Sequence, residues 1–179
     1  GLNRNFTTIN FFQLATAPIA SGIEEILPDR QGLWDTAPVM FSLRRDAFDR
    51  LLIGSMGKLI GTAQGGVSSR WAQKRLRRMF PELGEVTFEE GWHGQIAMTP
   101  DHLPRICNLD EGLYTPIGYN GRGITTGTVF GKAMSDLLTG LDATQLPLPV
   151  TSSKAVLMAP VMSRLYQAAF TVNQVLKSF

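Results

Sequence analysis

Short runs of hydrophobic and polar residues fill the first two-thirds of the chain and predict β-strands. The run Asn5–Pro18 is rich in β-branched and aromatic residues and stops at a proline, which predicts one long strand. Two shorter runs, Pro38–Arg45 and Asp49–Met56, are separated by a few residues that include Asp46. This pattern is typical of two strands joined in a hairpin.

Two further stretches also predict strands. Glu85–Pro100 alternates in part, and it predicts a strand with a kink at Gly91 or Gly94, because glycine inside a strand often marks a bulge. Arg105–Tyr119 predicts two strands around a tight turn at Asp110–Gly112, where an acid and a glycine provide the usual turn residues.

Four segments carry helix signals. Ser21–Leu27 starts with a capping serine, has acids in its first turn and ends before a proline. Residues at about 69–80 have apolar side chains at helical spacing, and Pro81 is expected to end that helix. Its predicted apolar face comprises Ala72, Leu76, Met79, Phe80 and Leu83. Later helices are predicted at Ile124–Leu138, closed by a glycine, and at Val161–Lys177.

Strands early in the chain and helices late predict an α+β fold. Of the 179 residues, 44% are hydrophobic and 18% are charged, which is typical of a folded globular protein. The formal net charge of +2 selects no class of partner. We expect neither a membrane span nor a signal peptide, since no apolar run is long enough and no basic leader is visible. The single cysteine, Cys107, excludes an internal disulfide and fits a reducing cytoplasm.

The stretch GYNGRGITTGTVFGKAMSDLLTG, residues 118–140, combines a glycine-rich loop with the start of a helix. A dinucleotide-binding turn has the pattern G-x-G-x-x-G and an acid about 20 residues further on. Counted from Gly121, Thr126 stands where the third glycine belongs. Asp142 lies at the right distance, but in a proline-containing linker instead of at the end of a second parallel strand. The stretch therefore fails as a nucleotide-phosphate turn.

Two interpretations of this loop remain open from the residues alone. Glycines allow the backbone to approach a ligand closely, and the first N–H groups of the following helix favour negative charge. The loop could therefore hold a ligand on which negative charge is present or develops. Alternatively, the glycines serve only a tight structural turn.

The same stretch, preceded by TPDHLPRIC and by a WHG segment, resembles the C-terminal part of the FAD-dependent amine and amino-acid oxidases. That family includes glycine oxidase, sarcosine oxidase and D-amino-acid oxidase. FFQLATAPI and LPDRQGLWDT further resemble the branch of γ-glutamylputrescine oxidoreductase-like proteins. The resemblance covers most of the chain and is strongest from Trp92 to Gly140; a TPD followed about seventeen residues later by GYNGRG is its most specific part.

The resemblance implies a domain organisation and a function. Residues 1–104 would form the mixed, mainly antiparallel substrate-binding sheet with flanking helices, including the helix at about 69–80. Residues 105–140 would form the C-terminal strand–turn–helix of the FAD-binding domain, and 141–179 a proline linker and last helix. The implied reaction is hydride transfer from the C–N carbon of a small amine or amino acid to FAD. The family's N-terminal Rossmann unit is absent, so we expect a fragment that is inactive alone; the alternative is a stand-alone, non-enzymatic binding module.

In this family the glycine-rich loop and helix start lie against the pyrimidine edge of the flavin ring. The resemblance thereby assigns cofactor binding to Gly118, Tyr119, Asn120, Gly121, Arg122, Gly123, Ile124 and Thr125. Sarcosine oxidase-like members have a lysine where this chain has Thr125, so one positive charge is missing here. Members with a covalent flavin have a cysteine at the position of Gly94, which predicts non-covalent FAD.

The other candidates are single residues, and no catalytic residue is assigned. His93 and Lys58 are candidates near the reaction, against the alternatives of a packed or half-exposed histidine and a surface lysine. Substrate candidates are Met40, Arg44 and Trp92; Arg44 or its neighbour Arg45 could bind a carboxylate or lie at a solvated strand edge.

Metal, nucleic-acid and membrane partners are not expected. The two histidines and the cysteine match no zinc spacing. The basic helix Arg70–Phe80 has an apolar face as well, and its charges are expected to be solvated instead of bound to nucleic acid. The last helix is apolar over a wide arc, which offers a surface for homo-oligomer formation.

Overall fold

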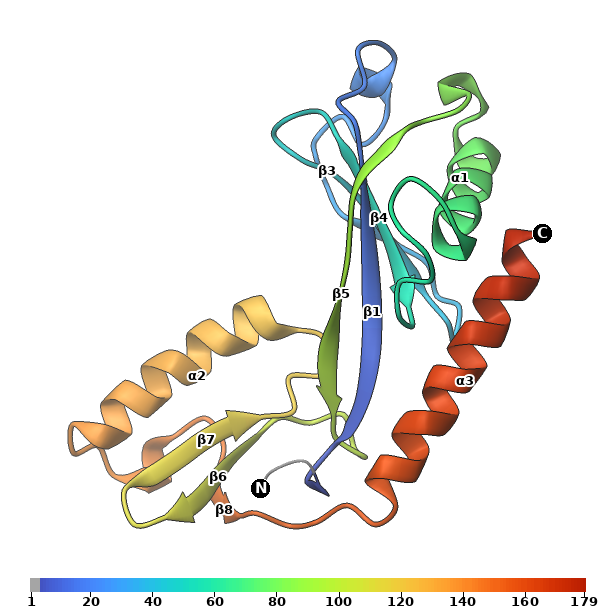
Figure 1. Cartoon of the computed structure of the whole chain (residues 1–179). Coiled ribbons are helices and arrows are strands. Elements are labelled where there is room, and N and C mark those ends of the chain that lie inside the picture. The colour runs from blue at the N-terminus through green and yellow to red at the C-terminus, as the bar shows by residue number, and fades with distance from the viewer. Residues whose placement is uncertain (1–3) are drawn as a thin grey trace. The chain divides into compact units, whose positions relative to one another are not determined.

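The computed structural model describes residues 4–179, and the chain divides into two compact units (Figure 1). Unit 1 comprises Gly1–Ile9 and Gln95–Arg164, and unit 2 comprises Asn10–Gly94 and Leu165–Phe179. Three elements contribute to both units: the strands β1 (Thr7–Thr16) and β5 (Phe88–Met98) and the helix α3 (Ala159–Ser178). The functional domains expected from the sequence, 1–104, 105–140 and 141–179, stay a prediction.

A five-stranded sheet has the strand order β2-β3-β4-β1-β5. β2 (Leu33–Trp34) pairs antiparallel with β3 (Phe41–Arg45), and β3 with β4 (Leu51–Met56). β4 also pairs antiparallel with β1, with Leu14 opposite Ile53. The long first strand, the hairpin and the α+β fold class predicted from the sequence are confirmed.

The core of unit 2 lies between one face of this sheet and α1 (Val67–Met79). Side chains alternate between the two faces of a strand, so Phe12 and Leu14 both point into the core and are fully buried. Phe12 meets Trp71 of α1 edge-on, with ring centroids 5.4 Å apart. The predicted apolar face is confirmed for α1, where Ala72 and Leu76 are buried and Met79 packs against the same core. Phe80 and Leu83 also pack against this core, but they lie beyond the end of the helix.

The predicted helix at Ser21–Leu27 is wrong. Only a short 3-10 turn, η2 (Ile23–Glu25), forms there, and it is preceded by Gly22 at φ 77° instead of a serine cap. Seven residues do not offset the cost of nucleating an α-helix. The burial of Ile23 and Ile26 in the core decides the path of this segment.

β5 runs without interruption through Gly91 and Gly94. Gly91 is explained by packing, because a Cβ there would lie 3.0 Å from Leu14 Cδ2 and 3.1 Å from Leu59 Cδ2. A Cβ at Gly94 would meet nothing within 4 Å.

Unit 1 contains a three-stranded sheet of order β7-β6-β8. β6 (Arg105–Asp110) and β7 (Leu113–Ile117) form the predicted antiparallel hairpin, with Gly112 at φ 68° in its turn. β8 (Val150–Ser152) pairs parallel with β6 and lies at the end of the stretch predicted to be a linker. Three residues carry no readable periodicity, so this strand was missed.

The two predicted late helices are confirmed. α2 (Gly123–Leu138) is followed by Gly140, whose φ is 106°. The Gly140 N–H donates to the Leu137 carbonyl (3.2 Å), and the Leu141 N–H donates to the Asp136 carbonyl (2.9 Å), which closes the helix. In unit 2, Gln174 of α3 is 1% exposed and accepts a hydrogen bond from the Ser68 hydroxyl at 2.9 Å. Among residues 4–179, no helix combines the length and apolar character needed to cross a membrane.

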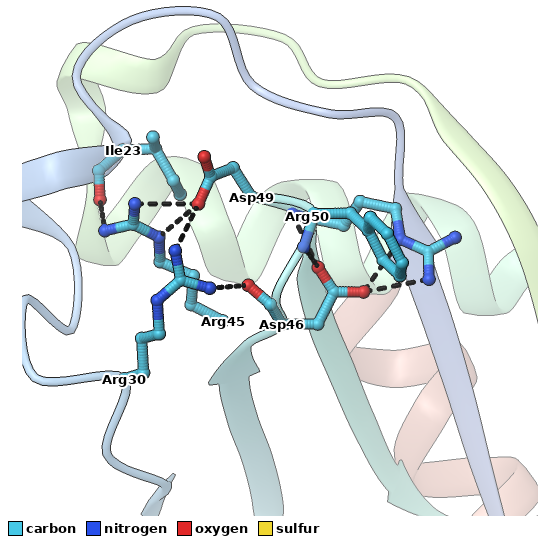
Figure 2. A network of polar contacts seen from close by, with 7 residues as sticks. Ile23, Arg30, Arg45, Asp46, Asp49 and Arg50 are labelled. Atoms are coloured by element: carbon cyan, nitrogen blue, oxygen red, sulfur yellow. Dashed lines mark hydrogen bonds and ion pairs between the residues drawn. The ribbon is translucent and has the colours of Figure 1, made fainter.

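A network of charged residues closes the turn between β3 and β4 (Figure 2). The Asp46 carboxylate accepts hydrogen bonds from the N–H groups of Phe48 (2.9 Å) and Arg50 (3.1 Å) and from the Arg50 guanidinium. On the other side of the turn, Arg45 donates to Asp49 at 2.7 Å. Both residues of each ion pair, Arg50–Asp46 and Arg45–Asp49, therefore belong to the β3–β4 hairpin.

We expect Asp46→Asn to reduce the dependence of unfolding free energy on acid. Burial would raise the pKa of Asp46, but the N–H groups and guanidinium that it accepts from outweigh burial and hold the pKa below its usual value. Its ionised form therefore stabilises the folded state above the unfolded pKa of about 4, and this stabilisation is lost as the pH falls toward the lower folded pKa. Urea unfolding between about pH 2 and 6 measures it. Glu82→Gln, the same charge change at an exposed site, is the control; equal pH profiles for wild type and Asp46→Asn would contradict the assignment.

Candidate functional site

The loop between β7 and α2 has an unusual backbone. Gly118, Asn120 and Gly121 all have left-handed φ angles, of 76°, 53° and 83°. The Arg122 N–H donates to the Tyr119 carbonyl at 2.9 Å and closes the turn. Glycine adopts this conformation without strain and asparagine with little, so the residue types fit the path of the loop.

The first turn of α2 presents unpaired donors. Arg122 occupies the N-cap position, and no side chain caps the helix. Among residues 4–179, the N–H groups of Gly123, Ile124 and Thr125 have no acceptor. Together with the helix dipole, these donors favour a ligand group that has or develops negative charge.

A cavity of about 500 Å³ adjoins this loop within unit 1. Loop residues 118–121 and Gly123 form one side. The remaining lining residues are mostly apolar and are Phe6, Gln95, Ile96, Ala97, Pro116 and Ile117. The volume is in the range of small-molecule and cofactor sites. A Cβ at Gly121 would lie 3.6 Å from Ile96 Cδ1, so the loop closely approaches this wall.

The ring of Tyr119 lies beside two further glycines of the stretch, at a distance that would admit a Cβ. This ring stacks on Phe130 of α2, with centroids 5.9 Å apart and an interplanar angle of 20°. Cβ atoms at Gly123 and Gly127 would lie 3.8 Å from this ring. Burial raises the pKa of the Tyr119 phenol, so it stays neutral at physiological pH. The ring lies against the start of α2 beside the cavity.

A residue that the sequence reasoning did not assign holds the loop from the side. Thr99, in the T-P-D segment after β5, is 2% exposed, and its N–H donates to Asn120 Oδ1 at 2.9 Å. Asn120 Nδ2 donates to Thr99 Oγ1 (3.1 Å) and to the Gly118 carbonyl. The sequence signal was the T-P-D motif itself, but no local pattern shows which distant residue the threonine contacts.

The substrate candidates Met40 and Arg44 lie in unit 2, at β3. Phe41 and Leu43 of that strand are buried in the core, so the alternate residues point to the other face of the sheet. Arg44 is exposed there. Arg45, the other carboxylate-binding candidate, is already bound: it donates to Asp49 and to a backbone carbonyl.

The same sheet face carries a polar residue that the sequence reasoning missed. Gln13, Gly54 and Ser42 are paired in one row across β1, β4 and β3. A Cβ at Gly54 would come well under 3.0 Å from the Gln13 carboxamide, so this side chain lies over the glycine. Its Nε2 reaches Ser42 Oγ only at 3.4 Å, and its buried Oε1 has no hydrogen-bond partner among the described residues.

The remaining candidates are also in unit 2. Trp92, which is 43% exposed, and exposed His93 lie on β5, and exposed Lys58 follows β4. Five of the eight loop residues line one cavity in unit 1, namely Gly118, Tyr119, Asn120, Gly121 and Gly123, whereas Arg122, Ile124 and Thr125 are not among its lining residues. The structure does not bring the catalytic and substrate candidates into that unit. Within the described part of the chain, no group of three or more metal-ligating side chains is clustered.

Relatives of known description match this chain. The family model described as "DAO: FAD dependent oxidoreductase" matches residues 9–137. The chain is 24% identical over 143 residues to "Probable oxidoreductase OrdL" of Haemophilus influenzae, covering 79% of this chain and 32% of that protein. It is 28% identical over 115 residues to "Gamma-glutamylputrescine oxidoreductase" of Escherichia coli, covering 64% of this chain and 27% of that protein.

Two other relatives extend this picture. "D-amino acid dehydrogenase" of a Methylobacterium strain is 33% identical over 95 residues, which are 51% of this chain and 23% of that protein. The chain thus spans about a third or less of the length of these curated relatives. The crystal structure of glycine oxidase from Geobacillus kaustophilus has a TM-score of 0.53 at 19% identity, covering 83% of this chain and 40% of that one, and supports the fold. Because the family model matches most of its residues, the chain belongs to the DAO family of FAD-dependent oxidoreductases.

Proposed function

We propose that this chain provides the flavin-ring loop and the substrate-facing sheet of an FAD-dependent oxidoreductase that oxidises a C–N bond of a small amine or amino acid. The observation that carries the proposal is the cavity of about 500 Å³ beside the unpaired N–H groups at the start of α2. The names of two relatives, a γ-glutamylputrescine oxidoreductase and a D-amino acid dehydrogenase, are consistent with this substrate class.

The residues present fit a flavin ring. A flat aromatic group needs apolar walls and close backbone approach, which Ile96, Pro116 and the glycines of the loop supply. The N–H groups of Gly123, Ile124 and Thr125 would donate to the pyrimidine edge of the ring, where negative charge develops when the flavin accepts a hydride. Gly94 stands at the position of the flavin-linking cysteine of other members, which favours non-covalent FAD.

FAD, when bound, supplies the hydride acceptor. The donors at the start of α2 stabilise negative charge that builds in the cavity, and they are already oriented, so no reorganisation is needed during the reaction. Arg122, exposed at the N-cap, adds a positive charge to the same side. Neutral Tyr119 covers the start of the helix and limits access of water. No general base is required of the chain if the amine is bound neutral, because the protein then contributes orientation and electrostatics.

For the substrate side, the proposal assigns the sheet face that points away from the core of unit 2. Arg44 would bind a carboxylate, and the Gln13 carboxamide and Ser42 hydroxyl would bind polar groups of the substrate. Met40 and Trp92 would supply apolar contacts. His93 and Lys58 remain candidates for a role near the reacting atoms.

The proposal is tested on the protein purified as its whole gene encodes it. The expected result is a flavin absorbance band that denaturation releases into solution, with FAD as the released compound. A colourless protein that does not take up added FAD would overturn the proposed function, and it would leave the stand-alone binding module as the better account.

A charge at the start of α2 should separate flavin binding from stability. Ile124 is 91% exposed in the first turn, and we expect Ile124→Glu to weaken FAD affinity about tenfold by repulsion of negative charge. The same change should leave the unfolding temperature unchanged or slightly higher, because an acid near a helix N-terminus is favourable by about 0.3–1 kcal/mol. Fluorescence titration with FAD and thermal unfolding measure the two effects.

The matched control is Val129→Glu, which adds the same charge at a half-exposed position further along α2. This variant should change FAD affinity by less than about twofold, because the new charge lies more than a helical turn away from the N–H donors at the start of α2. Equal effects of the two variants on FAD affinity would contradict the assignment of the helix start as the flavin contact.

A further inference from the structure

We infer that Thr99 is a positioning residue for the flavin-ring loop: from its place directly after β5, it fixes the backbone of Gly118–Arg122 without itself lining the cavity. The inference rests on the proposed function for its cofactor. Its structural basis is a set of hydrogen bonds that joins the end of β5 to the loop between β7 and α2.

Every polar group of Thr99 is engaged. The N–H donates to Asn120 Oδ1 at 2.9 Å, and the carbonyl accepts from the His102 N–H at 3.1 Å. The hydroxyl donates to the Leu103 carbonyl at 2.8 Å and accepts from Asn120 Nδ2 at 3.1 Å. A residue that is 2% exposed and fully satisfied in this way has little freedom to move.

The hydrogen bonds with Thr99 hold the backbone of Asn120 in a left-handed conformation. Asn120 has φ 53°, and this left-handed region carries a small energetic cost for asparagine, lower than for most other non-glycine residues. Its carboxamide is bound at both ends: Oδ1 to the Thr99 N–H, and Nδ2 to Thr99 Oγ1 and to the Gly118 carbonyl. These contacts offset this cost and define the left-handed path of the loop.

The methyl group of Thr99 fixes the other end of the loop. A Cβ at Gly118 would lie well under 3.0 Å from Thr99 Cγ2, so the Thr99 methyl group packs directly against the backbone of Gly118. Thr99 therefore restrains Asn120 by hydrogen bonds and Gly118 by steric contact. The N–H groups of α2 follow directly after this segment, and their direction depends on it.

The neighbouring turn keeps Thr99 in place. Asp101 accepts a hydrogen bond from the Leu103 N–H at 3.2 Å and pairs with Arg105 at 2.9 Å. Arg105 is the first residue of β6, so the turn after Thr99 is tied to the sheet of unit 1. The loop is thus positioned by a rigid element and not only by its own glycines.

Thr99→Val and Thr99→Ser test this inference in the FAD-binding protein. Valine has nearly the same shape but removes the hydroxyl, and we expect about tenfold weaker FAD affinity, the size expected from losing one buried hydrogen bond. Serine keeps the hydroxyl and its hydrogen bonds but loses the methyl group that packs against Gly118, so the affinity should return to within about threefold of wild type and not fully. The readouts are fluorescence titration with FAD and amide hydrogen exchange of the FAD-free protein at Arg122, whose N–H closes the loop.

Thr16→Val is the matched control. Thr16 is a fully buried threonine of unit 2, and its hydroxyl accepts from the Leu51 N–H at 3.0 Å. This variant should lose stability like Thr99→Val but retain FAD affinity and the exchange rate at Arg122. That comparison separates positioning of the loop from a general loss of stability.

The outcomes are distinct. Faster exchange at Arg122 and weaker FAD binding in Thr99→Val, both largely restored in Thr99→Ser, support the inference. If wild type binds FAD and Thr99→Val binds it equally well, or if Thr16→Val weakens FAD binding as much, this inference alone is overturned. If wild type binds no FAD, the proposed function fails and the inference fails with it.

Discussion

Gly118→Ala is expected to lower the free energy of unfolding by about 2–5 kcal/mol and to abolish measurable FAD binding. Gly118 has φ 76°, and an alanine in this left-handed region is strained by about 1–2 kcal/mol. In addition, its Cβ would overlap Thr99 Cγ2, so Thr99 or the loop must move, at a further cost of about 1–3 kcal/mol. Because Thr99 also binds Asn120, this movement would displace the loop itself.

Gly112→Ala isolates the strain from the overlap. Gly112 lies in the turn between β6 and β7 with φ 68°, and a Cβ there meets nothing within 4 Å. It should cost only about 1–2 kcal/mol and leave FAD affinity unchanged. Denaturant unfolding and FAD titration of both variants provide the measurement. Equal destabilisation by the two substitutions would show that Thr99 does not restrict Gly118.

The second large effect is expected at the centre of the other unit. Gly54→Ala should destabilise the protein by about 3 kcal/mol, which corresponds to a fall of about 6–12 °C in Tm for a chain of this size. Gly54 is buried in β4, and a Cβ there would overlap the Phe12 carbonyl and the Gln13 carboxamide. A backbone carbonyl cannot turn away as a flexible side chain can, so β1 and β4 must separate.

Gly94→Ala is the control for Gly54→Ala, because it adds the same methyl group to a strand of the same unit where nothing lies within 4 Å. It should be neutral or slightly stabilising, since alanine restricts the unfolded chain. Thermal unfolding compares the two variants. If Gly54→Ala unfolds at the wild-type temperature, the close approach of Gln13 and β4 is wrong, and so is the proposed role of Gln13 on this sheet face.

The sequence by itself determined the elements with strong local signals. β1, the β3–β4 hairpin and the β6–β7 hairpin were predicted because β-branched and aromatic enrichment and turn residues act over a few neighbouring positions. α2 was predicted almost to the residue, because its glycine-rich start and the αL glycine at its end are local too. The loop at 118–125 was found in the same way, although the residues alone left open whether it binds a ligand or only turns.

Only the tertiary structure decided the features that depend on distant contacts. Ser21–Leu27 is no α-helix, because burial of Ile23 and Ile26 outweighs a good cap in so short a segment. The short strand β8 forms because it pairs with β6. Position 91 favours glycine because the side chains of Leu14 and Leu59 leave little space for a Cβ there. Thr99 and Asn120 are far apart in sequence, and their hydrogen bonds follow no periodicity. Local patterns specify elements, whereas the contacts that position the loop form only when those elements meet.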